Sequence, residues 1–164
     1  MSNVLRIALV DPNDGTRESL KAMLLGMDTV WLEADCSRYE FFPDVIEQTG
    51  PDVGVISLDN NPDKAIDLIQ RLGRDAPETA ILAASEDTDG HLILRTIRAG
   101  AREFLTLPVS DEDLSSALQR VSQLFFLELH LAHIGFRLPA LLRLAVLSPD
   151  STLQETAGRA VLST

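Results

Sequence analysis

Residues 51–60 read PDVGVISLDN, and this stretch decides the fold class that the sequence predicts. Its centre, residues 53–56, is a short apolar run between Pro51 and a turn-rich segment. Such a run is typical of a strand that is buried on both faces of a parallel sheet. Ligands of open α/β sheets bind beyond the carboxyl ends of the strands. We therefore expect any functional site to include Ser57, Leu58 and Asp59, which leave this strand.

Segments typical of strands alternate with segments of helical periodicity over residues 1–122. The expected strands cover residues 5–10, 29–33, 53–56, 80–84 and 103–105. The expected helices cover residues 16–25, 39–48, 64–73 and 90–99, and a fifth begins after Ser110, which can cap it. Strands and helices in this order, joined by short loops, predict a parallel sheet covered on both sides. The fold class is therefore α/β, a flavodoxin-like doubly wound sheet with strand order 2-1-3-4-5.

The composition restricts the class of protein. The chain has 164 residues, a net charge of −11 and 45% apolar residues, which is typical of a soluble globular domain. Nucleic-acid and anionic-membrane binders need a surplus of Lys and Arg, so we expect neither partner. A lone Cys36 excludes an internal disulfide and a multi-cysteine zinc site. With no signal-peptide pattern at the start, we expect a cytoplasmic protein.

The pattern changes after Gln123, so we expect one α/β domain at residues 1–122 and a C-terminal extension at residues 123–164. Charged residues interrupt the apolar stretch at 124–147, which argues against a transmembrane helix. We expect the fifth helix to continue into the extension and to break between Gly135 and Pro139. Helical segments at 140–147 and 152–162 are expected to follow. His130 and His133 are expected to be ordinary helix residues, because two ligands do not make a metal site.

The order of elements and the residues at the strand ends resemble the receiver domain of bacterial response regulators (the CheY-like superfamily). The resemblance covers about residues 4–122. The matching landmarks are Val10-Asp11, Pro51-Asp52, Ser85, Ala99-Gly100-Ala101 and Pro108. Such receivers carry an acidic pair after the first strand, a phosphoacceptor Asp after the third, a Ser or Thr after the fourth and a Lys after the fifth. Together these residues bind Mg²⁺ and stabilise an aspartyl-phosphate.

This chain keeps two of those five positions, Asp11 and Ser85. The other three positions of this degenerate phosphorylation pocket hold Pro12, Ser57 and Leu107. Mg²⁺ needs oxygen ligands, and phosphoryl transfer depends on positioned charge, so these replacements remove most of the chemistry. We therefore expect a pseudo-receiver with no enzymatic activity and no cofactor.

Residues 99–108, AGAREFLTLP, are similar to the amino-terminal domain of the TadZ/CpaE pilus-assembly proteins. The resemblance implies a module for protein interaction and localisation in Flp/Tad-type pilus assembly or related signalling. In those proteins an ATPase domain with a phosphate-binding loop follows the amino-terminal domain. No such loop is found in this sequence. Receivers commonly dimerise through the fourth helix, fifth strand and fifth helix, which implies a homodimer here. The corresponding interaction face comprises His91, Leu94, Arg95, Arg98, Glu103 and Phe104.

Two alternatives remain open. The chain could be a working phosphorelay receiver that is phosphorylated at Asp59, with Asp11 and Asp59 as weak Mg²⁺ ligands. Against this, Asp59 lies in a run of helix-capping residues and is expected to cap the third helix. Likewise, Ser85 is expected to bond local backbone rather than to act as a switch. A small-molecule-binding flavodoxin-like domain is the other alternative, and no cofactor motif supports it.

Overall fold

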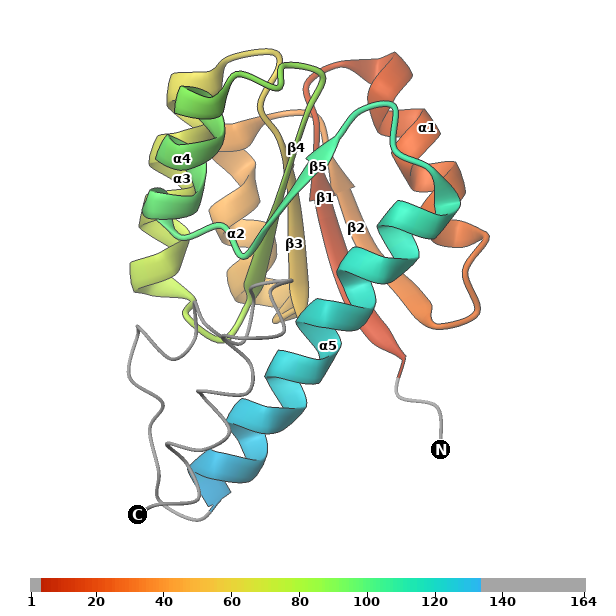
Figure 1. The fold of residues 1–164 in the computed structure, drawn as a ribbon, viewed down its shortest axis with the longest axis vertical. Coiled ribbons are helices and arrows are strands. Elements are labelled where there is room, and N and C mark those ends of the chain that lie inside the picture. The colour runs from red at the N-terminus through yellow and green to blue at the C-terminus, as the bar shows by residue number, and fades with distance from the viewer. Residues whose placement is uncertain (1–3, 134–164) are drawn as a thin grey trace. The chain divides into compact units, whose positions relative to one another are not determined.

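The fold is known from a computed structural model, which describes residues 4–133. Its sheet is five-stranded with the order β2-β1-β3-β4-β5, and each neighbouring pair is parallel. The predicted fold class and strand order are therefore confirmed (Figure 1). The strands are β1 (Leu5–Val10), β2 (Val30–Cys36), β3 (Val53–Ser57), β4 (Ala80–Ser85) and β5 (Glu103–Thr106).

The helices that connect the strands are α1 (Asp14–Leu25), α2 (Phe42–Thr49), α3 (Pro62–Asp75), α4 (Gly90–Ala99) and α5 (Asp111–His133). The helix expected at residues 39–48 is divided into a 3₁₀ turn, η1 (Tyr39–Phe41), and α2. Pro43 explains the division, because proline lacks an N–H and is tolerated only in the first turn of a helix. The one-helix prediction for this segment was therefore wrong.

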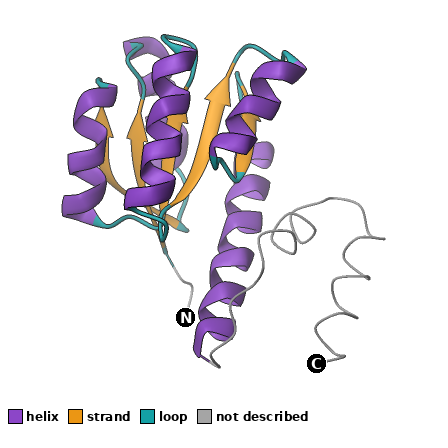
Figure 2. Ribbon diagram, turned by 90° about the vertical axis from the view of Figure 1, so that its left-hand side faces the viewer, coloured by secondary structure: helices purple, strands orange, loops and turns teal. Residues whose placement is uncertain are grey.

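The helices α2, α3 and α4 cover one face of the sheet, in front of the strands in Figure 2, and α1 lies on the other face. Side chains alternate between the two faces along each strand. In β3 every residue is buried, as expected of a central strand covered on both sides. Gly54 makes room for the side chain of Ile81 of β4, because a Cβ at this position would lie 3.0 Å from Cδ1 of Ile81.

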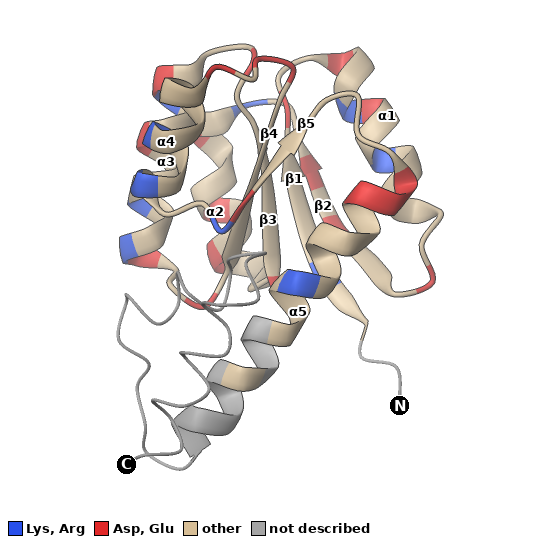
Figure 3. Cartoon of the chain, in the orientation of Figure 1, with Lys and Arg blue, Asp and Glu red and all other residues tan. Residues whose placement is uncertain are grey.

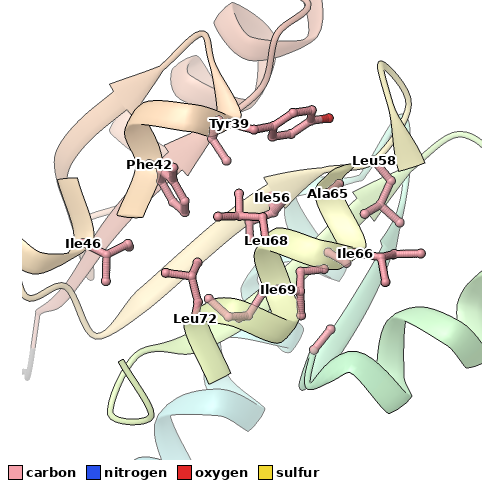
Figure 4. Close-up of a cluster of buried hydrophobic side chains, with 14 of the residues drawn as sticks. Tyr39, Phe42, Ile46, Ile56, Leu58, Ala65, Ile66, Leu68, Ile69 and Leu72 are labelled. Carbon is pink, nitrogen blue, oxygen red and sulfur yellow. The ribbon is translucent and has the colours of Figure 1, made fainter. Parts of the chain in front are cut away.

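One core cluster fills the space between the sheet and the helices α2, α3 and α4 (Figure 4). Ile56 of β3 and Ile69 of α3 are completely buried in it, and Phe42 of α2 closes its end. The Tyr39 ring is also in the cluster, and its hydroxyl donates a 2.6 Å hydrogen bond to the carbonyl oxygen of Ser57. This bond ties the turn before α2 to the carboxyl end of β3.

Polar residues begin and end the helices as the sequence predicts. The Oγ of Ser110 accepts a hydrogen bond from the backbone N–H of Asp113, so the predicted cap of α5 is confirmed. Gly100, with φ of 123°, ends α4 as predicted. Asn61, and not Asp59, caps α3, because its Oδ1 accepts from the N–H of Lys64. The expectation that Asp59 caps this helix was wrong.

The chain divides into two compact units, Met1–Ala117 and Leu118–Thr164, and α5 contributes residues to both. The helix continues to His133, as predicted. The expected break at 135–139 and the helical segments at 140–147 and 152–162 lie outside the described residues. Within residues 4–133, no helix is long and apolar enough to cross a membrane.

We predict that Ile69→Ala lowers the free energy of unfolding by about 2 to 5 kcal/mol, because it leaves a cavity in a completely buried site. Urea denaturation followed by circular dichroism measures the change. The control is Leu25→Ala, at a position that is 63% exposed, where the expected change is within about 0.5 kcal/mol. A loss of equal size in both variants would contradict the assigned core.

We also predict a displaced tyrosine titration, which is simple to observe because the chain has one tyrosine. Burial raises the pKa of Tyr39 to about 12, and the charges of Asp11 and Asp59 act in the same direction. The folded state therefore binds the phenol proton more tightly than the unfolded state does. The contribution of Tyr39 to the free energy of unfolding is complete below pH 10.0 and decreases as the pH rises towards about 12. Ultraviolet absorbance of tyrosinate measures the midpoint. A folded-state midpoint equal to that in urea, about 10, would show that Tyr39 is not buried.

Candidate functional site

The candidate site lies at the carboxyl ends of the three central strands, β1, β3 and β4. Asp11 follows β1, Ser57 ends β3 and Ser85 ends β4, and the three residues are 0%, 1% and 0% exposed. They are three of the five buried polar or charged residues among those described. Buried polar groups need partners, so the hydrogen bonds around these residues decide what the site can do.

Both carboxylate oxygens of Asp11 are used within the loop between β1 and α1. Oδ1 accepts from the backbone N–H of Asn13 at 2.9 Å, and Oδ2 accepts from the hydroxyl of Thr16. These bonds hold the turn that starts α1, where Asn13 is the N-cap. The acidic residue that this chain shares with receivers therefore acts as a brace for its own loop.

Arg17 places a positive charge beside this loop. Its guanidinium donates to the carbonyl of Asp11 at 2.8 Å and to the carboxylate of Asp14 at 2.6 Å. The hydrogen bond to Asp14 is the first cause that raises the pKa of Arg17, with the charge of Asp35 acting in the same direction. Asp35 also lies 3.5 Å from the ammonium of Lys21. The carboxylates of Asp14 and Asp35 are thus engaged by cations of α1.

Ser57 occupies the position at which receivers carry the phosphoacceptor carboxylate. Its backbone pairs with Ala84 of β4, and its carbonyl accepts the hydroxyl of Tyr39. A buried hydroxyl here carries no negative charge. A serine in this environment is a poor nucleophile for phosphoryl transfer.

The carboxylate of Asp59 joins the loop after β3 to the loop after β4. Its Oδ1 accepts from the hydroxyl of Ser85 at 2.5 Å, and Glu86 donates its backbone N–H to both oxygens at 3.2 and 3.0 Å. Ser85 in turn accepts from the N–H of Asp87 at 3.0 Å. We call these contacts the Asp59 link. They bring together two predicted site residues that are 26 positions apart in the chain.

Leu107 occupies the position of the receiver lysine. Its backbone N–H donates to the carbonyl of Ser85 at 2.8 Å, which places it directly beside the Asp59 link. The Leu107 side chain is 8% exposed, so an apolar group fills the place of an ammonium. A leucine cannot stabilise the charge of a phosphoryl group. Pro12, the remaining position, has no carboxylate.

Among residues 4–133, no group of three or more His, Cys, Asp or Glu side chains is placed to hold a metal ion. The two weak Mg²⁺ candidates belong to different networks, since Asp11 braces its own loop and Asp59 binds the loop after β4. Figure 3 shows acidic positions along both loops at this edge of the sheet.

The predicted interaction face lies on α4 and β5. His91, Leu94, Arg95 and Arg98 of α4 are exposed, and Leu94 is 45% exposed. Arg95 forms a 2.7 Å ion pair with Asp63 of α3, so its charge is partly engaged. Phe104 of β5 is only partly exposed because it packs against the core cluster, and Glu103 beside it is also partly buried.

Sequence reasoning missed three residues that shape the site. They are Thr16, Arg17 and Tyr39, whose contacts with the strand ends are given above. The first two lie in the first turn of α1, five and six residues after Asp11, so their closeness in the sequence is a signal that could have found them. Nothing local could have paired Tyr39 with Ser57, because 18 residues separate them.

This chain is similar to solved structures, but it matches no family model and no curated protein. Many solved structures do match it at low identity. A pilus assembly-related protein from Burkholderia pseudomallei is 18% identical with a TM-score of 0.68, and the match covers 75% of this chain and 92% of that one. The CpaE pilus assembly protein from Burkholderia thailandensis is 18% identical, with a TM-score of 0.67 over 73% of this chain and 99% of that one.

Response regulators match equally well. The isolated REC domain of RcsB from Salmonella enterica serovar Typhimurium, determined with a phosphomimetic beryllofluoride, is 13% identical with a TM-score of 0.66. That match covers 74% of this chain and 90% of the REC domain. Identities this low establish the fold alone. The chain has the receiver fold, which response regulators and CpaE pilus assembly proteins also have.

Proposed function

We propose that this chain is a non-catalytic pseudo-receiver that acts as a protein-interaction and localisation module. The Asp59 link carries the proposal. Ser57 stands where the acceptor should be, and the nearest alternative carboxylate, Asp59, already accepts three hydrogen-bond contacts from the neighbouring loop. With Leu107 in place of the lysine, the pocket has neither a free nucleophile nor a cation for the transferred group.

Energetics favour this proposal over phosphorylation. A hydrogen bond to a charged group contributes about 1.5 to 3 kcal/mol, so attack by Asp59 requires the loss of several such contributions. Phosphoryl transfer also depends on positioned positive charge, and Arg17, the cation nearest to Asp11, is already engaged by Asp14. Each missing interaction lowers the rate by orders of magnitude.

A second candidate function is a phosphorelay receiver that is phosphorylated at Asp59. One observation favours it: Asp59 is exposed, and its carboxylate lies against the hydroxyl of Ser85, which is at the position of the receiver Ser or Thr. In this case the Asp59 link would open on phosphorylation, and Mg²⁺ would be needed. The two functions therefore differ in whether the link is permanent.

Similarity to the CpaE and pilus assembly-related structures supports a narrower proposal. In it, the chain serves Flp/Tad-type pilus assembly or related signalling in the bacterial cytoplasm. Both matches have the same fold at 18% identity, so they support the choice of system without establishing it. A localisation module needs a stable surface more than a working pocket, and this agrees with a chain whose site charges are engaged internally.

We further propose a homodimer through α4, β5 and the start of α5. This face carries an exposed Leu94 on the same helix as Arg95 and Arg98, and the acidic residues 111–113 begin α5 (Figure 3). In a two-fold interface each surface meets its own copy, so the basic α4 of one subunit can lie opposite the acidic start of α5 of the other. An apolar residue within a charged rim is also typical of interfaces.

For the pocket, we predict no saturable response to beryllofluoride at millimolar Mg²⁺, because both oxygens of Asp11 and of Asp59 already accept hydrogen bonds and Leu107 provides no positive charge. Amide NMR shifts at Asp11, Ser57, Asp59 and Ser85 measure the response. Mass spectrometry after treatment with acetyl phosphate should likewise show no added phosphoryl group. A saturable response that Asp59→Asn removes, while Asp67→Asn retains it, would establish the phosphorelay function instead.

For the dimer, we predict that Leu94→Asp converts the chain to a monomer, because it places a charge at the apolar centre of the interface. Sedimentation equilibrium measures the mass in solution. The matched control is Leu25→Asp, which changes an exposed leucine on α1 and should leave the dimer intact. A wild-type chain that sediments as a monomer at all concentrations would refute this part of the proposal.

A further inference from the structure

A groove lies between α2 and the carboxyl-terminal half of α3, at the amino ends of β3 and β4. Its volume is about 630 Å³, within the range of binding pockets in proteins. Pro51, which precedes β3, and Thr79, which precedes β4, line its end. Ser57 and Ser85 end the same two strands, so the groove is at the opposite edge of the sheet from the candidate site.

The floor of the groove is apolar and firmly held. Ile46 of α2 and Leu72 of α3 belong to the core cluster, and each is 2% exposed. The hydroxyl of Thr79 donates a 2.9 Å hydrogen bond to the carbonyl of Pro51, so the polar groups at this end satisfy each other. A floor of this kind can accept an aliphatic side chain without a large rearrangement.

The rim of the groove is acidic. It carries Asp44, Glu47, Asp75 and Glu78, and its one cation, Arg71, forms a 3.3 Å ion pair with Asp75. Within the described part of the chain, Asp44, Glu47 and Glu78 form no ion pair, so the rim has a net charge of −3 from four carboxylates and one guanidinium.

A further cation close to the groove is fully engaged. Arg6 donates to the carbonyls of Thr49 at 2.5 Å and Gly50 at 3.1 Å, and its guanidinium pairs with Glu33 at 2.6 Å. The rim carboxylates repel one another and lie around an apolar floor. They are complementary to a chain segment that has positive charges on either side of an apolar side chain.

We propose that this groove binds a basic peptide segment of a partner protein. An aliphatic side chain of the segment rests on Ile46 and Leu72, and flanking Lys or Arg side chains lie opposite Asp44, Glu47 and Glu78. A single metal ion is not the occupant, because no three carboxylates of residues 4–133 converge. The groove is separate from the α4 face, so one molecule can hold a basic partner and a second copy of itself together.

The test uses the full 164-residue chain and a fluorescein-labelled, amidated peptide of sequence GKRLLRKG as the probe. Fluorescence anisotropy at low salt should show saturable binding that weakens as salt is added. Amide NMR shifts should be centred on Ile46, Leu72 and Thr79. The acidic peptide GEELLEEG should not bind, because it has the same apolar centre with the opposite charge.

The decisive variant is Glu47→Lys/Glu78→Lys, which reverses two exposed charges of the rim. It should weaken binding about tenfold or more. The matched control, Glu18→Lys/Asp28→Lys, makes the same change of net charge in and after α1 and should change binding less than about twofold. Unchanged urea unfolding curves show that each variant is folded. Leu94→Asp should bind the peptide like the wild type, which separates this proposal from the dimer.

Three results would overturn the proposal. Equal weakening in both charge variants would mean that only the overall negative field attracts the peptide. Shifts centred away from Ile46 and Leu72 would place the peptide elsewhere. If Glu47→Lys/Glu78→Lys instead changed the sedimentation of the chain without peptide, the occupant would be a second copy of this chain.

Discussion

The Asp59 link depends on the burial of β3, and so does most of the site. β3 lies between β1 and β4, and helices cover both of its faces, so no residue of this strand can move without disturbing two layers. That burial fixes the residue at which the chain leaves the sheet. Ser57 is held inside, Leu58 is completely buried, and Asp59 is the first residue that can reach solvent. The carboxylate therefore emerges beside β4, where Ser85 and Glu86 are the donors within reach.

The carboxylates of Asp11 and Asp59 at this edge accept hydrogen bonds from neighbouring groups of the chain. Asp11 is completely buried and keeps its two oxygens for Asn13 and Thr16. A buried carboxylate is costly unless its lone pairs are used, and here a short loop uses them. A receiver needs the opposite arrangement, with free carboxylates converging on one cation. Leu107 agrees with the arrangement in this chain. A lysine at the same buried position would be an unpaired ammonium if no phosphoryl group were bound.

Much of the fold could be predicted because hydrophobic periodicity is local. The bounds of β1 and α4 agree with those expected, and β3 was recognised from one apolar run. The contacts that define the site are not local. Residue types predicted which positions are degenerate, but they could not show that Asp59 bonds Ser85 in place of capping α3. The division of η1 from α2 was missed because Pro43 is compatible with either a continuous helix start or a new one.

The two edges of the sheet therefore have different roles, and this follows from how a parallel sheet is built. Strands enter at one edge and leave at the other, so the carboxyl edge collects the residues that phosphoryl chemistry uses, and the amino edge collects loops with no such constraint. In this chain the carboxyl edge carries Ser57 and Leu107, and the Asp59 link joins two of its loops. The amino edge retains unpaired acidic residues, Glu47 and Glu78, above a buried floor. Repulsion between these negative charges is mildly unfavourable to the folded chain. A basic partner bound in the groove reduces this repulsion without any change at the carboxyl edge.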